Sequence, residues 1–194
     1  MNLFHKIKKA IVKKLVKRIL HRFKESHDQR KALAARQGKV FAPVGGRVLP
    51  MADVPDDIFG QGDLGDGCGI WPDAAELVSP VDGTVSATMP LEHMVGITSD
   101  DGIEVLLHVG HGTRDDQSTG FERLVEKGQH VEVGTRVMTF PHDADDTTGS
   151  GHLVVVAIPN SADYASVALL ATEAVSVGQP LLEATAKRPD APSR

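Results

Sequence analysis

From about Lys39 onward, short apolar runs alternate with polar residues and are separated by glycine, proline and aspartate. This pattern is typical of β-strands joined by tight turns. Phe121–Glu126 is expected to form one short helix. The expected strands lie at Val40–Pro43, Gly46–Leu49, Cys68–Trp71, Glu76–Ser79, Gly83–Val85, Pro90–Ile97, Ile103–Gly110, twice within Gln129–Met138, and at Leu153–Ile158, Ala174–Val177 and Pro180–Leu182. Strands at this spacing predict an all-β fold, an antiparallel β-sandwich or distorted barrel whose layers are connected by turns.

The first 31 residues follow a different period. Apolar residues recur there in steps of three and four, at Leu3, Phe4, Ile7, Ile11, Leu15, Ile19 and Phe23. Lysines occupy the other faces, so the segment is predicted to be an amphipathic helix with a cationic side. We expect residues 32–38 to be a linker, residues 39–186 to be the β domain and residues 187–194 to be a flexible tail.

The charge is distributed unequally between these parts. Residues 1–31 hold 11 Lys and Arg against 2 Asp and Glu, a net of +9, whereas the rest of the chain carries −14. A basic amphipathic helix can lie in the headgroup plane of an anionic membrane. Packing of its apolar stripe against the core is the alternative. Nucleic acid is not an expected partner, because phosphates would repel the acidic body.

Size and cysteine use limit the class of protein further. A chain of 194 residues is long enough for one domain with a sizeable core and an appendage. Its single cysteine, Cys68, cannot form an internal disulfide, which favours a reducing compartment. The lysine-rich N-terminus lacks the apolar stretch of a signal peptide. The expected location is cytoplasmic, with peripheral attachment to the inner face of the membrane.

Two histidines carry the candidate chemistry. His93 and His108 lie in two apolar runs that are separated by a turn at Asp100–Gly102, a pattern that predicts a hairpin. The hairpin would fold the two imidazoles toward one another. Paired imidazoles suit metal binding, or the relay of a proton or a phosphoryl group. The remaining histidines do not lie in such a pair of strands, and we interpret them as solvated or incidental. His111 is ambiguous, because it lies only three residues after His108.

Residues 39–186 resemble the glucose-type enzyme IIA domain of the bacterial phosphoenolpyruvate:sugar phosphotransferase system. Each matching stretch is weak alone, but together they follow the family's order over about three-quarters of the chain. The matching stretches are Ala42–Gly46, Val54–Asp56 with Phe59, Gly65–Gly67, Ser79–Val85, His93 with Ser99–Gly102, Leu107–Gly110 with Thr113, Gly120–Phe121, Glu126–Gln129 with Val131 and Gly134, and Ile158–Asn160.

The resemblance implies a function and a set of roles. His108 would accept a phosphoryl group from the histidine phosphocarrier protein and pass it to the IIB domain of a sugar permease, and His93 would stabilise it by hydrogen bonding. No dissociable cofactor is expected. A metal held by His93 and His108 at an interface, with a carboxylate from a partner, stays open as an alternative, although two ligands alone bind weakly. The family fold has a shallow apolar depression around the histidines where partner proteins dock. The expected members of this depression are Val54, Phe59, Val95, Val109 and Phe121.

The chain departs from the family pattern in two places near the site. Leu91 stands where a threonine is usual, two residues before the first histidine, and Gly112 stands where an aspartate is usual, four residues after the second. The loss of one charge-assisted hydrogen bond would cost about 1.5–3 kcal/mol. These departures favour, as an alternative function, a non-catalytic or phosphorylation-dependent regulatory binding protein of the same fold.

Two other classes fit the sequence less well. A zinc metallopeptidase with a related β-core would use an H-x-H pair, which the sequence does not contain. A biotin- or lipoyl-type carrier would need a lysine at the tip of a hairpin, and residues 79–121 contain no lysine. The sequence therefore favours the phosphoryl-carrier interpretation.

Overall fold

The computed structural model describes residues 35–55, 59–88, 93–110, 120–141 and 153–187. The chain divides into two compact units, Met1–Gln37 and Gly38–Arg194. The expected helix over residues 1–31 and the tail after Lys187 lie outside the described residues, as do Leu91, His111 and Gly112. Within the described ranges, no helix combines the length and the apolar character that a membrane span requires.

The second unit is built from short strands and two 3-10 turns. The strands are β1 (Lys39–Phe41), β2 (Gly46–Pro50), β3 (Asp66–Pro72), β4 (Glu76–Val78), β5 (Gly83–Thr88), β6 (Met94–Ser99), β7 (Glu104–Val109), β8 (Glu122–Arg123), β9 (His130–Val131), β10 (Arg136–Thr139), β11 (Val154–Ile158), β12 (Tyr164–Leu169), β13 (Ala174–Val175) and β14 (Pro180–Ala186). The 3-10 turns are η1 (Met51–Asp53) and η2 (Ser161–Asp163).

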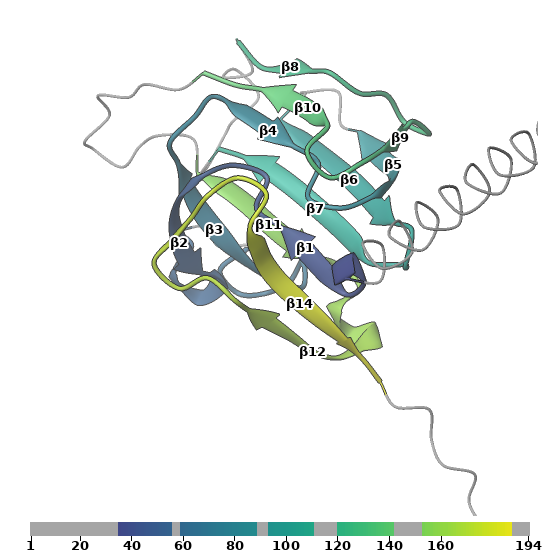
Figure 1. The fold of residues 1–194 in the computed structure, drawn as a ribbon. Coiled ribbons are helices and arrows are strands. Elements are labelled where there is room, and N and C mark those ends of the chain that lie inside the picture. Colours follow the sequence, from purple (N-terminus) through teal and green to yellow (C-terminus); the bar gives the residue numbers. More distant parts are fainter. Residues whose placement is uncertain (1–34, 56–58, 89–92, 111–119, 142–152, 188–194) are drawn as a thin grey trace, which may run out of the picture. The chain divides into compact units, whose positions relative to one another are not determined.

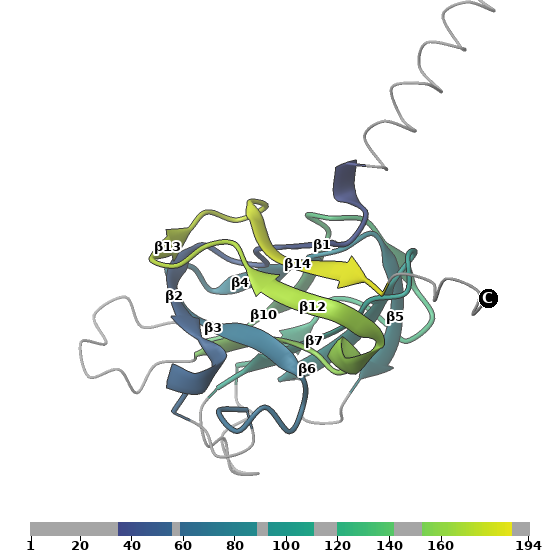
Figure 2. The same cartoon turned by 90° about the horizontal axis from the view of Figure 1, so that it is seen from below.

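The strands form one large sheet and two small ones. The large sheet has the order β13-β2-β3-β11-β7-β6-β5-β9, and the small sheets have the orders β1-β14-β12 and β4-β10-β8. Each strand pairing found in the described ranges is antiparallel. Figures 1 and 2 show β1, β14 and β12 stacked over one face of the large sheet. The predicted antiparallel β-sandwich is thus confirmed.

Alternate side chains along the central strands belong to two different apolar clusters. In β11, Val154, Val156 and Ile158 enter the main core between the sheets. The residues between them, Val155 and Ala157, belong to a smaller cluster on the other face of the large sheet. Successive side chains of a strand point to opposite faces, so a run that is apolar throughout is buried on both sides. We call the smaller cluster, which contains Val54, Phe59, Leu153, Val155 and Ala157, the outer cluster.

Two elements differ from the sequence-based expectation. The helix expected over Phe121–Glu126 is wrong, because Glu122 and Arg123 form strand β8 and pair with β10. Phe121 and Val125 are both buried in the core, and this four-residue spacing imitates one face of a helix. Strand β12 was not expected, because its residues Ala165, Ser166 and Ala168 are small and exposed. Its pairing with the distant strand β14 stabilises it instead.

The buried thiol of Cys68 leads to a prediction about stability at high pH. Cys68 lies in β3 with no exposed surface, and burial raises the pKa of its thiol from 9.0 to about 12. Between these two values the unfolded chain loses the thiol proton and the folded chain keeps it. The contribution of Cys68 to stability should therefore fall by about 1.4 kcal/mol per pH unit as the pH rises above 9.

The measurement is urea denaturation of the wild type and of Cys68→Ala from pH 8 to pH 11. The difference between their free energies of unfolding should narrow steadily above pH 9. A difference that stays constant over this range would show that Cys68 ionises in the folded chain as it does in the unfolded one.

Candidate active site

The predicted hairpin brings His93 and His108 together, as the sequence indicated. Strands β6 and β7 pair with Met94 opposite His108, and the amide of Val109 donates to the His93 carbonyl at 2.9 Å. The turn between the strands contains Gly102 at a φ of +94°, a conformation that glycine adopts without steric cost. Both histidines lie at the end of the hairpin opposite this turn, so the local turn chemistry sets their register.

The two imidazole rings meet edge to face. Their centroids are 5.1 Å apart and their planes are inclined by 88°. His108 is 7% exposed, whereas His93 is half-buried. The reactive surface of His108 is therefore small, and that of His93 beside it is larger. The two rings are close enough for one ligand to form a bond to the first imidazole and a hydrogen bond to the second.

Each histidine also contacts a phenylalanine. The ring of Phe59 lies 5.0 Å from that of His108, with 37° between their planes. The ring of Phe121 lies 6.5 Å from that of His93 in a T-shaped contact at 76°. Phe59 comes from the connection between η1 and β3, and Phe121 directly precedes β8. Four aromatic rings from three separate parts of the chain are therefore in sequential contact.

Of the five apolar residues expected around the histidines, the structure places Phe59 and Phe121 against the imidazole rings and Val54 in the same cluster as Phe59. Phe59 and Val54 belong to the outer cluster on the face that carries His108, and Phe121 contacts His93. The prediction that Val95 and Val109 surround the histidines is wrong, because both are fully buried in the main core on the opposite face. Val109 follows His108 directly in β7, and neighbouring residues of a strand point to opposite sides. Val109 therefore faces away from His108 although it follows it directly in the chain.

Several other residues around the site were not expected from the sequence. Leu49, Met51, Leu64, Trp71 and Leu106 pack on the outer cluster. The signal that could have found Leu106 is its position two residues before His108, which places both on one face of β7. The others depend on pairing between distant strands, in which Gly69, Val155 and His108 lie in one row across β3, β11 and β7.

Backbone contacts close the site next to His108. The amide of Gly110 donates to the Leu153 carbonyl at 2.9 Å, and Gly110 has a φ of +108°. A side chain at this position would be strained, because this left-handed region is costly for residues with a Cβ. Gly110 thus permits the sharp bend of the chain directly after the buried histidine.

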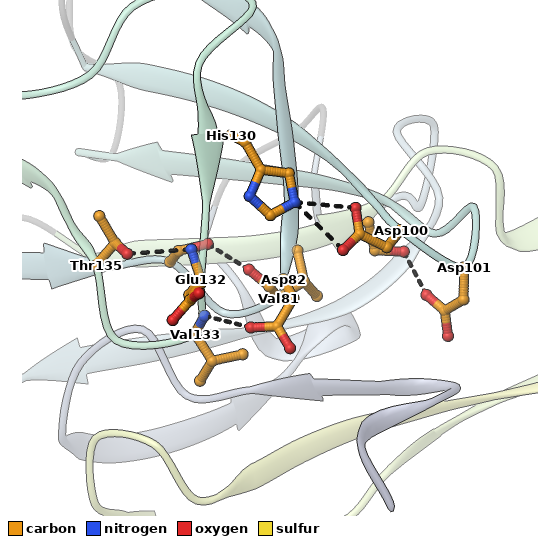
Figure 3. A network of polar contacts seen from close by, with 10 residues as sticks. Val81, Asp82, Asp100, Asp101, His130, Glu132, Val133 and Thr135 are labelled. Carbon is orange, nitrogen blue, oxygen red and sulfur yellow. Dashed lines mark hydrogen bonds and ion pairs between the residues drawn. The ribbon is translucent and has the colours of Figure 1, made fainter. Parts of the chain in front are cut away.

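His130, which the sequence led us to interpret as incidental, has a structural partner at the far end of the hairpin. Its Nε2 lies 3.2 Å from Oδ1 of Asp100. Figure 3 shows this contact beside Asp82, whose carboxylate accepts the amide of Val133 at 2.7 Å. Asp100 and His93 lie at opposite ends of β6, about 20 Å apart. Both members of the ion pair are exposed, and such pairs stabilise by about 0–1 kcal/mol.

The side chains around the histidines also bear on metal binding. Among the residues that the structure describes, no three His, Cys, Asp or Glu side chains come together in a way that could hold a metal ion.

Comparison with known proteins identifies the class. Residues 38–164 match the family described as phosphoenolpyruvate-dependent sugar phosphotransferase system, EIIA 1. The glucose-specific EIIA component of Staphylococcus epidermidis is 33% identical over 141 residues, which cover 73% of this chain and 85% of that protein. The raffinose carrier protein of Pediococcus pentosaceus is 37% identical over 122 residues, which cover 63% of this chain and 19% of that protein.

A solved structure supports the same relationship. The glucose permease IIA of Mycoplasma capricolum matches with a TM-score of 0.62 and 27% identity, over 74% of this chain and 93% of that chain. The protein belongs to the EIIA family of the phosphoenolpyruvate-dependent sugar phosphotransferase system. It is a phosphotransferase that carries a phosphoryl group on histidine in sugar transport, and sugar-permease components are its partner class.

Proposed function

We propose that His108 is the residue that accepts and donates the phosphoryl group, and that His93 stabilises this group during transfer. The observation that carries the assignment is the edge-to-face contact of the two rings at 5.1 Å. His108 is the more deeply buried of the two, and the bond that forms there is shielded from water. His93 is half-buried and can contact the phosphoryl oxygens from the side.

The transfer requires no change in the number of bound protons. A lone pair on a neutral nitrogen of His108 attacks phosphorus, and a P–N bond forms as the P–N bond of a donor phosphohistidine breaks. The bonding pair leaves with the donor imidazole, which becomes neutral. Phosphoryl transfer of this kind has a loose, in-line transition state, so positioning and charge stabilisation supply the catalysis. An N–H of His93 can donate to a phosphoryl oxygen in this state.

The donor in this proposal is the histidine phosphocarrier protein, and the acceptor is the IIB domain of a sugar permease. The outer cluster beside His108 supports docking of such partners, because Leu49, Leu64 and Trp71 remain partly exposed around it. An apolar surrounding also strengthens the electrostatic contacts of the phosphoryl group once a partner has excluded water. The sugar would be selected by the permease.

The proposal is tested by incubating the protein with phosphoenolpyruvate, enzyme I and the phosphocarrier protein, followed by intact-mass analysis. We expect a gain of one acid-labile phosphoryl group that maps to the peptide containing His108. If the wild type gains none while the carrier phosphorylates another acceptor, this chain has the family fold without its chemistry. The non-catalytic binding function would then replace the relay.

The basic N-terminal segment adds a proposed membrane contact. Residues 1–31 carry a net charge of +9 and an apolar stripe at helical spacing. Such a helix would hold the protein at the cytoplasmic face of an anionic membrane, close to the permease that receives the phosphoryl group. Attraction of about 1 kcal/mol for each basic residue near the surface makes this contact dependent on lipid charge.

Vesicle sedimentation tests this contact. The full chain should bind vesicles that contain phosphatidylglycerol, and binding should weaken as salt rises. Replacement of Lys6, Lys9, Lys13 and Lys17 by glutamine should lower the affinity by about fivefold for each residue. A chain that binds neutral and anionic vesicles equally would contradict the proposal. Glutamine at Lys39 and Lys127, in the β domain, is the matched control and should leave binding unchanged.

A further inference from the structure

The orientation of the His108 ring depends on its neighbours. Rotation of an imidazole about its outer side-chain bond has broad, roughly two-fold preferences, so packing must select one orientation. The described structure places two rings against His108, at 5.0 Å for Phe59 and 5.1 Å for His93. Phe59 is inclined by 37° and covers part of the imidazole face, whereas His93 is almost perpendicular. Of the two neighbours, Phe59 has no group that can bond a phosphoryl oxygen.

Phe59 is itself held rigidly. It is 4% exposed and packs in the outer cluster with Val54, Val155 and Leu153. The Phe59 carbonyl accepts the amide of Gly62 at 2.9 Å, and the Gly62 carbonyl accepts the amide of Gly65 at 3.0 Å. These two turns connect the Phe59 backbone to the start of β3, which is paired with β11.

Gly69 lies in β3 and allows Val54, on the segment that leads to Phe59, to pack closely against the sheet. A Cβ at Gly69 would lie 3.0 Å from Cγ2 of Val54 and 3.3 Å from a methyl carbon of Leu153. Both distances are tighter than ordinary packing, so a side chain here would push Val54 outward. Because Gly69 shares a row with Val155 and His108, this displacement would occur on the face that carries the imidazole. Gly69 therefore supports the position of Phe59 indirectly.

From these contacts we infer that Phe59 is a positioning residue for phosphoryl transfer, which fixes the ring plane of His108 so that its reactive nitrogen faces the incoming phosphorus. The inference rests on the proposed role of His108. It distinguishes Phe59 from the apolar residues that only form a surface for partners. A displacement of about 1 Å at a reacting atom can cost about a hundredfold in rate, so loss of the ring should affect the chemical step.

Kinetics of phosphoryl uptake from the phosphocarrier protein separate positioning from docking. Phe59→Met keeps most of the apolar volume and removes the planar ring, and Phe59→Leu is a second variant in case the first folds poorly. We expect kcat to fall by about 10- to 100-fold with the KM for the carrier nearly unchanged. Phe59→Tyr keeps the ring and should restore most of the rate. The matched control is Leu64→Ala in the same connection and cluster, which should affect KM more than kcat.

A second measurement does not depend on phosphorylation. Proton NMR spectra of the His108 imidazole report the orientation of its ring through nuclear Overhauser contacts with neighbouring protons. The wild type and Phe59→Tyr should show the contacts of one ring orientation, and Phe59→Met and Phe59→Leu should show the contacts of two. Unchanged spectra, or an effect confined to KM, would overturn the inference and assign Phe59 to docking. Failure of the wild type to become phosphorylated at His108 would instead overturn the proposed function, with the spectra still testing the ring contact.

Discussion

Replacement of His108 by glutamine is expected to abolish phosphoryl uptake, because the nitrogen that forms the P–N bond is then absent. The fold should survive, since His108 lies on the outer face of β7 and the main core is filled by its neighbours Leu107 and Val109. Intact-mass analysis after incubation with phosphoenolpyruvate, enzyme I and the phosphocarrier protein measures the effect. The expected spectrum is that of the unmodified protein.

Replacement of His93 by glutamine should give a different result. Phosphoryl uptake should persist but slow by about 10- to 100-fold, which corresponds to the loss of one charge-assisted hydrogen bond of about 1.5–3 kcal/mol. The same loss should appear when the phosphorylated protein passes its group to a permease IIB domain. The matched control is His130→Gln at the far end of the hairpin, which should keep the wild-type rate.

Two outcomes would contradict the assignment of roles. A phosphoryl group that His108→Gln still gains, mapped to another histidine such as His111, would move the acceptor elsewhere. Equal and complete loss in both the His93 and the His108 variants, with folding intact, would mean that the two imidazoles act as one unit rather than as acceptor and stabiliser.

Leu107→Ala is expected to destabilise the fold by about 2–5 kcal/mol, the range for truncation of a buried leucine. Leu107 has no exposed surface and packs in the main core between the sheets. The cavity left by its side chain has few ways to collapse, because the paired strands β6 and β11 fix the backbone on both sides of β7. Urea denaturation followed by circular dichroism measures the change in the free energy of unfolding.

Leu106→Ala is the matched control for this prediction. It removes the same atoms from the preceding residue, which points to the other face of β7 and is only partly buried in the outer cluster. Its cost should be well below that of Leu107→Ala, because less apolar surface returns to water. Equal costs for the two variants would show that the outer cluster contributes as much to stability as the main core.

Local sequence patterns were sufficient for the hairpin that carries the site. The apolar runs on either side of Asp100–Gly102 predicted two paired strands, and the turn at Gly102 with positive φ supplies the required geometry. The strand Leu153–Ile158 was also evident, because a run that is apolar throughout indicates burial on both faces. The prediction of a helix at Phe121–Glu126 also relied on local spacing and was wrong. Buried residues four positions apart fit an irregular strand as well as a helix.

Sequence by itself determined the all-β class, the pairing of His93 with His108 and the family resemblance, because these depend on turns, alternation and motifs that lie close together in the chain. The tertiary structure alone decided that Val95 and Val109 face the core and that β12 joins β14. The family resemblance placed Phe59 near the histidines, and the structure added that its ring packs on that of His108. Phe59 and His108 are separated by several strands in the chain. Their contact follows from the pairing of β3 with β11 and of β11 with β7, and such long-range pairing has no local signature.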